Sequence, residues 1–142
     1  MAVIALTPND YIKIFGDGSM ATYPFTFNQF NPPVTVNITF KAVNRRVIVK
    51  IPIIQGINIS ATPQLTSTTL MSTTDYGLYA PVTKSSTLIR TISGNTRMLG
   101  LVSIGAVAPS SIKLTISFSM FDASVFTTGS NSGNSTQGFV VY

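Results

Sequence analysis

The stretch Val34-Thr35-Val36-Asn37-Ile38-Thr39-Phe40-Lys41 alternates apolar with polar side chains. In an extended chain, successive side chains point to opposite faces, so the four apolar residues would share one face. Residues 112–120 repeat the pattern, and their apolar members are Ile112, Leu114, Ile116, Phe118 and Met120. A helix would mix the polar and apolar sets on every face. Both stretches are therefore predicted to be half-buried β-strands.

Further strands are predicted at residues 11–15, 22–27, 46–55, 88–92, 98–104 and 138–142, which have apolar alternation or short apolar runs. Residues 42–45 would form a hairpin with Asn44 at positive φ, and Pro52 would lie at a sheet edge or a bulge. No stretch of helical length has apolar residues at three-and-four spacing. Residues 60–74 and 127–137 are predicted as surface loops because Ser, Thr, Asn and Gly dominate them.

These elements predict an all-β fold, an antiparallel β-sandwich of the jelly-roll type with about eight strands. An up-and-down barrel is the alternative, since it requires the same alternation. The 142 residues are expected to form a single domain, residues 1–142. No stretch approaches the roughly 18 uninterrupted apolar residues of a membrane span, and none is predicted.

The composition excludes most catalytic chemistry. The chain has no Cys, His or Trp, and its four acidic residues are all aspartates. Zinc sites, disulfides, Cys nucleophiles and His-dependent triads need side chains that are missing. We therefore predict a protein that is not an enzyme and that uses neither a metal nor a cofactor.

The formal net charge is +5, and the one local group of cations is Lys41, Arg45, Arg46 and Lys50. Clustered cations can bind phosphate, but these four surround the predicted hairpin turn. Cations at turns and edges also protect sheets from pairing with each other. The sequence therefore favours a solvated turn, and nucleic-acid binding is not predicted.

Only 9% of the residues are charged, whereas 44% are hydrophobic. A soluble domain carries about 25% charged residues, which dilute its exposed apolar surface. Residues 46–54 and 98–104 are apolar on both faces of their predicted strands. The composition thus predicts that neighbouring copies bury part of the surface. The alternative is a loop that covers the outer face.

Asp75, Tyr76 and Tyr79 lie in a conspicuous predicted loop, residues 75–81. Tyrosine offers stacking area and a hydroxyl group at low entropic cost. These three residues are the candidate contacts for a receptor or a sugar, and packing beneath the rim of the sandwich is the alternative. Residues 16–18, Gly-Asp-Gly, are predicted as a tight turn and not as a calcium loop, which would need more oxygen ligands.

Residues 15–19 (FGDGS), 23–27 (YPFTF) and the strand at 34–40 together resemble the opening of β-sandwich modules in bacteriophage tail fibres and related virion proteins. Residues 97–104, the turn at Gly105, the strand at 112–120 and the aromatic end at 139–142 resemble the closing half of viral fibre heads. This resemblance implies a structural virion protein: a capsid-surface, fibre-head or receptor-attachment domain. It would be localised in the virion and assembled in the host cytoplasm.

The first hypothesis is thus a homotrimer that contacts other virion proteins and recognises a host-surface glycan or protein through loops on a rigid scaffold. A metal-independent, lectin-like carbohydrate-binding module is the alternative from another class. Binding to a glycan array without any particle would favour it. A small β-barrel enzyme or ligand carrier is the third alternative, which a deep apolar cavity would favour.

Overall fold

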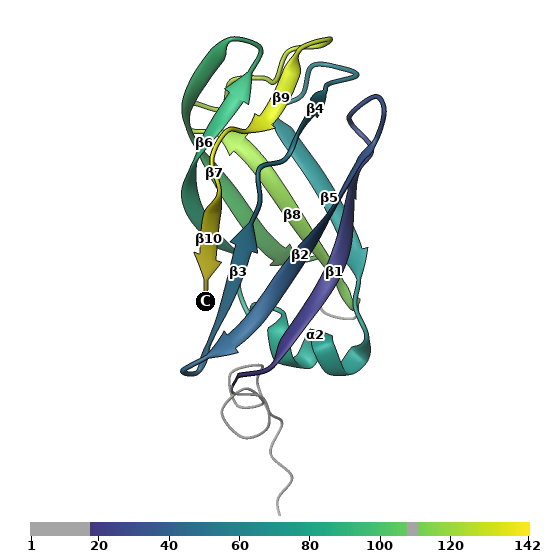
Figure 1. The fold of residues 1–142 in the computed structure, drawn as a ribbon, viewed down its shortest axis with the longest axis vertical. Helices are drawn as coiled ribbons and strands as arrows, with labels where there is room; N and C mark the ends of the chain where they lie inside the picture. The colour runs from purple at the N-terminus through teal and green to yellow at the C-terminus, as the bar shows by residue number, and fades with distance from the viewer. Residues whose placement is uncertain (1–17, 108–110) are drawn as a thin grey trace, which may run out of the picture.

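The computed structural model describes residues 18–107 and 111–142. This part of the chain folds into two antiparallel sheets and one short helix (Figure 1). The four-stranded sheet has the order β1 (Met20–Phe27), β2 (Val34–Val43), β3 (Arg46–Ile51), β10 (Gly138–Val141). The six-stranded sheet has the order β4 (Gln55–Ile57), β9 (Asn131–Asn134), β6 (Ser85–Ser93), β7 (Thr96–Ala106), β8 (Lys113–Met120), β5 (Gln64–Leu70). The helix α2 (Thr73–Tyr79) lies at the end of the sandwich where the β2–β3 hairpin turns.

The strand order confirms the predicted antiparallel sandwich. β1, β2 and β3 form a sequential meander. β5 comes before the meander of β6, β7 and β8 in the chain and lies beside its last strand, β8, which makes a Greek key. Strands far apart in the sequence are neighbours in both sheets, as β3 and β10 are, which distinguishes the fold from an up-and-down barrel.

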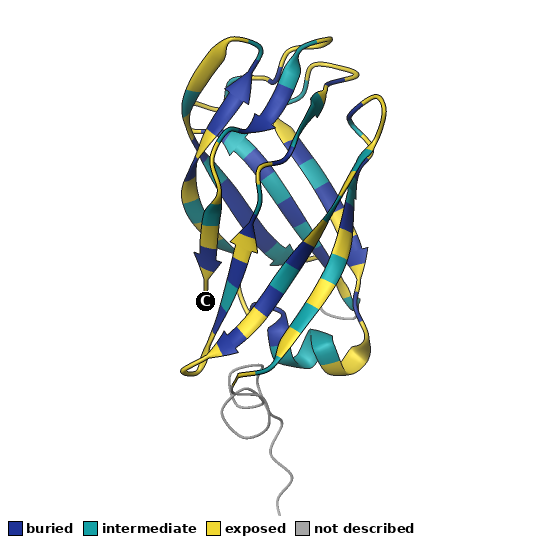
Figure 2. Cartoon of the chain, viewed as in Figure 1, coloured by how far each residue is buried: buried dark blue, intermediate teal, exposed yellow. Residues whose placement is uncertain are grey.

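Alternation of side chains builds the core between the sheets. Buried and exposed residues alternate along most of the strands, as the bands in Figure 2 show. The inward residues of β2 and β8 include Ile38, Phe40, Ile116 and Phe118, which are almost completely buried. Phenylalanine rings from both sheets meet in the core, and the centroids of Phe27 and Phe118 lie 5.9 Å apart. The two stretches that predicted the fold class therefore supply facing halves of its core.

The β2–β3 hairpin is tight. β2 ends at Val43 and β3 begins at Arg46, so Asn44 and Arg45 form a two-residue turn. Both residues have positive φ, 51° and 64°, which is the geometry of a type I′ turn. The predicted positive φ of Asn44 is confirmed, and Arg45 shares it.

Several predicted boundaries were wrong. The strand at 46–55 breaks after Ile51, and Pro52 lies in the break before β4. Residues 60–74 contain the strand β5, and the predicted loop at 75–81 overlaps the helix α2. Residues 127–137 contain the strand β9, whose last three residues are buried. The predicted strand at 11–15 and most of the turn at 16–18 lie outside the described residues.

Asn134 anchors β9 to the chain between the two sheets. Its side chain is fully buried, and its Oδ1 accepts a hydrogen bond of 2.9 Å from the backbone N–H of Ile54. Its Nδ2 donates to the carbonyl oxygens of Pro52 and Thr136, both at 2.8 Å. This one amide therefore fixes the break between β3 and β4 against the C-terminal segment.

Candidate recognition surface

The helix α2 carries the three predicted contact residues. Ser72 caps its N-terminus, and the Ser72 Oγ accepts a hydrogen bond from the backbone N–H of Asp75. The carboxylate of Asp75 accepts a hydrogen bond from the Tyr23 hydroxyl of β1, which ties the helix to the four-stranded sheet. Tyr76 is half-buried and packs against the edge of the core. Asp75 and Tyr76 thus lie at the end of the sandwich and remain candidate contacts.

Tyr79 belongs to the core. It is 1% exposed, and its ring centroid lies 6.2 Å from that of Phe40. Its hydroxyl donates to Ser19 Oγ at 2.7 Å, and its carbonyl accepts a hydrogen bond from the Tyr142 hydroxyl. The alternative of packing beneath the rim therefore holds for Tyr79, and a ligand on this surface would not reach its side chain.

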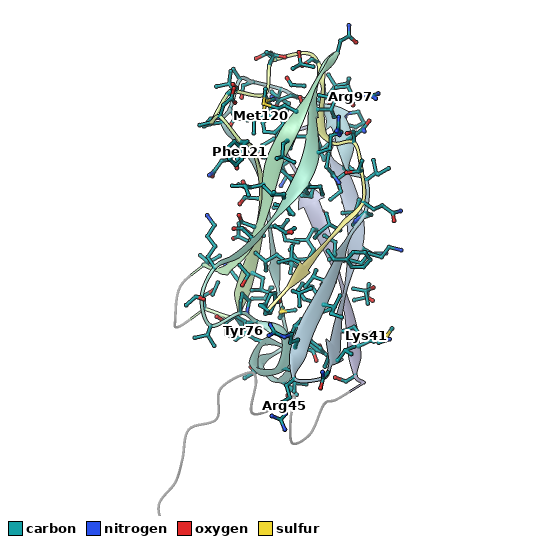
Figure 3. The ribbon with its side chains drawn as sticks, turned by 90° about the vertical axis from the view of Figure 1, so that its left-hand side faces the viewer. Lys41, Arg45, Tyr76, Arg97, Met120 and Phe121 are labelled. Carbon is teal, nitrogen blue, oxygen red and sulfur yellow. The ribbon has the colours of Figure 1, made fainter. Side chains whose placement is uncertain are left out.

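The four clustered cations occupy the β2–β3 hairpin and the outer face of its sheet. Lys41 lies opposite Ile48, while Arg46 and Lys50 flank Ile48 on β3. Arg45 lies at the tip, near the end of the molecule that carries Tyr76 (Figure 3). All four side chains are exposed, and none has an acidic partner among the described residues. An open hollow of about 480 Å³ lies at the tip, lined by Asn44, Arg45, Arg46 and Tyr142.

The outer face of the six-stranded sheet has a polar half. The strand registers align four hydroxyl side chains across neighbouring strands, a group that we call the hydroxyl strip: Ser86, Ser103, Ser117 and Thr66. Ser86 Oγ and Ser103 Oγ lie 2.7 Å apart. A shallow hollow of about 220 Å³ borders the strip, and Lys84 and Gly105 also line it. Hydroxyl groups both donate and accept hydrogen bonds, so this face suits a polar ligand.

The other half of the same face carries a group of apolar side chains, next to Arg90, which lies opposite Leu99, and Arg97. Leu88 lies directly opposite Leu101, and the backbone N–H of Phe121 donates to the carbonyl of Leu99. We call these four residues the apolar strip. Leu88, Leu99 and Phe121 are 54%, 49% and 66% exposed. Phe121 lies away from the end that carries Tyr76 and Arg45 (Figure 3).

Within residues 18–107 and 111–142, no three His, Cys, Asp or Glu side chains are grouped as metal ligands would be. In the same ranges, no helix is long and apolar enough to cross a membrane. Burial raises the pKa of the Tyr142 hydroxyl well above its ordinary value. That hydroxyl therefore stays protonated while it donates to the carbonyl of Tyr79.

No protein-family model matches the chain, and no curated protein matches it in sequence. Among solved structures, the fold is similar to a reovirus attachment protein, sigma1, determined in complex with alpha-2,3-sialyllactose. The TM-score is 0.48 and the identity is 9%, and the match covers 87% of this chain and 63% of that chain. The chain thus spans less than two thirds of that chain's length. So distant a likeness assigns neither a ligand nor a partner to this chain.

Sequence reasoning missed both strips on the six-stranded sheet. Their residues come from strands far apart in the chain, such as Thr66 on β5 and Ser117 on β8. Alternation predicts which face a residue occupies, but only the register between strands decides its neighbours. The apolar character of residues 98–104 was the one signal, since Leu99 and Leu101 lie in that stretch.

Proposed function

We propose that this protein is a non-enzymatic structural component of a virion: a capsid-surface, fibre-head or receptor-attachment domain that works as a homotrimer. It would act by binding, with recognition residues on a rigid sandwich. One observation carries the proposal. Fourteen large apolar side chains of the described residues are between 37% and 72% exposed, although the chain is short of charge. Three of them, Leu88, Leu99 and Phe121, lie together on the outer face of the six-stranded sheet, and exposed apolar groups that gather in this way are typical of interaction sites.

The apolar strip is the proposed contact between copies. Leu88, Leu99 and Leu101 occupy adjacent positions on β6 and β7, the two central strands of their sheet. Burying a leucine side chain completely contributes roughly 1.5–3 kcal/mol of favourable free energy. A few such residues from each copy would therefore stabilise the association of copies substantially.

Native mass spectrometry of the full chain tests this proposal, with Leu99→Arg as the variant. Unmodified protein should appear as a trimer. Leu99→Arg should release monomers because the new cation, opposite Arg90, would be desolvated beside a like charge and without an anionic partner. Leu70→Arg is the matched control, since Leu70 is 62% exposed on β5 of the same sheet, away from the strip. A strictly monomeric unmodified protein at high concentration would overturn the proposal.

A metal-independent, lectin-like module is the second candidate function. The hydroxyl strip and the adjoining hollow support it, because hydroxyl-lined surfaces can pair with the hydroxyl groups of a sugar. Binding of neutral glycans on an array by a monomeric domain, abolished by Ser103→Val, would favour this candidate. Ser124→Val, a half-exposed serine outside the strip, is the control. No binding by the unmodified chain would exclude it.

A further inference from the structure

We infer that the outer face of β2 and β3 is a binding site for a sulfated polysaccharide, through Lys41, Arg46, Lys50 and the hairpin residue Arg45. This inference rests on the proposed attachment function, since a ligand of this class lies on the outside of cells. The site is the face opposite to the one that carries the apolar strip, because the two sheets form the two layers of the sandwich (Figure 1).

The register between β2 and β3 spaces three cations along the outer face of these strands. The register places Lys41 opposite Ile48, so Arg46 and Lys50 are its two diagonal neighbours on β3. Diagonal neighbours on one face of an antiparallel pair lie about 7–8 Å apart. Arg46 and Lys50 are four residues apart on one strand, a separation of about 13 Å at the usual rise per residue. Three cations thus form a row that matches a linear polyanion better than a single small anion.

Nothing in the described fold uses these charges. Among the described residues, the side chains of Lys41, Arg46 and Lys50 form no ion pair and no hydrogen bond. Three like charges at this spacing repel one another, so they weaken the folded state while no anion is bound. No ion pair or side-chain hydrogen bond within the described residues therefore accounts for their arrangement.

The turn between β2 and β3 carries a fourth cation, Arg45. Arg45 has a φ of 64°, a conformation in which glycine is strongly preferred at the second position of a type I′ turn. The type I′ turn requires this positive φ, yet the chain carries arginine at a position where glycine would be unstrained. The guanidinium of Arg45 extends the row of cations to the tip, where it borders the open hollow that Arg46 also lines.

The rest of the face favours a sugar polymer over nucleic acid. Thr39 lies opposite Lys50, and Thr22 opposite Thr39, so hydroxyl groups continue the row beside the cations. These groups can bind sugar hydroxyls. Single-stranded nucleic acid is bound by several aromatic side chains on which bases stack. Beside this row, Phe139 points outward opposite Lys50, whereas Tyr142 in the hollow is half-buried and its hydroxyl donates to the Tyr79 carbonyl.

Heparin, a sulfated polysaccharide, tests the site with two variants of equal net charge. Lys41→Gln/Lys50→Gln removes two cations from the face, and Arg97→Gln/Lys113→Gln removes two exposed cations from β7 and β8 of the other sheet. We expect the first pair to weaken heparin binding on the order of tenfold and to reduce the salt dependence of binding by about two counterions. The control pair should change the affinity less than threefold. Thermal unfolding of each variant confirms that the exposed substitutions leave the fold intact.

Three results would overturn the inference: equal weakening by both pairs, no heparin binding by the unmodified chain at physiological salt, or tighter binding to single-stranded DNA than to heparin. Unsulfated dextran should not bind, and its binding would point to the lectin-like alternative. Native mass spectrometry on the same samples separates this inference from the proposed function. A trimer without heparin binding contradicts only the polysaccharide site, whereas a monomer that binds heparin through Lys41 and Lys50 contradicts only the proposed assembly.

Discussion

Replacing Asn134 with alanine should destabilise the fold by about 4 kcal/mol. The substitution removes three hydrogen bonds, to the N–H of Ile54 and to the carbonyl oxygens of Pro52 and Thr136. A buried donor left without a partner costs roughly 1–3 kcal/mol, and a lost hydrogen bond to a partly solvated carbonyl costs roughly 0.5–1.5 kcal/mol. The hydrogen bond to Ile54 is buried, so its loss falls in the first range. The bonds to Pro52 and Thr136 are partly buried, so the loss of each falls in the second range, and the three losses together cost about 4 kcal/mol.

Urea unfolding at a fixed protein concentration measures this cost, because the midpoint falls while the slope stays constant if only the native state is weakened. Asn37→Ala is the control: Asn37 is exposed on β2, so its removal should change the free energy of unfolding by less than about 0.5 kcal/mol. Asn134→Asp should cost at least as much as alanine. It keeps an acceptor for Ile54 but removes both donors and buries a charge. A loss below about 1 kcal/mol for Asn134→Ala would refute the buried position of β9.

The remaining predictions concern Tyr142, whose backbone pairs with that of Val47 on β3, and Arg45 in the β2–β3 turn. Burial raises the pKa of Tyr142 in the folded chain, so the stability that it contributes is complete below the ordinary tyrosine pKa of about 10 and is lost as the pH rises further. Melting temperatures between pH 7 and pH 11 should therefore fall less steeply above pH 10 for Tyr142→Phe, and parallel curves would contradict this. Arg45→Gly should raise the free energy of unfolding by about 0.5 kcal/mol, since glycine relieves the positive φ at some entropic cost. The same variant should elute earlier from heparin, and unchanged elution would exclude Arg45 from the site.

The sequence predicted those strands whose inward residues are apolar. β2 and β8 were found at nearly their true bounds, because every inward position there is Ile, Leu, Phe, Val, Ala or Met. β5 was missed because its inward face mixes Leu65 with Ser67 and Thr69. Ser67 is buried only because its Oγ donates to the carbonyl of Thr26 on the opposite sheet, and this tertiary contact leaves no periodic signal in the sequence.

β9 and α2 escaped prediction for different reasons. The residues 131–134 contain no apolar side chain, and their burial depends on the hydrogen bonds of Asn134 and on Gly133. A Cβ at Gly133 would clash with the carbonyl oxygen of Ile54. The helix has seven residues, too few for a recurring apolar face. Its start nevertheless had a signal, since Ser72 followed by Asp75 is the spacing of an N-terminal cap.

The fold decides where the few charged residues of this chain lie on its surface. All nine basic residues except Lys13 lie in the described part, and three of them occupy the outer face of one sheet. The opposite outer face holds the apolar strip on β6, β7 and the end of β8. If copies associate through the apolar strip, each keeps its cationic face outward, so a trimer would present three such faces to one polymer. Linked sites increase the apparent affinity without any new contact. Leu99→Arg should therefore weaken heparin retention even though Leu99 lies on the other sheet, and unchanged retention by the monomeric variant would show that the two surfaces work independently.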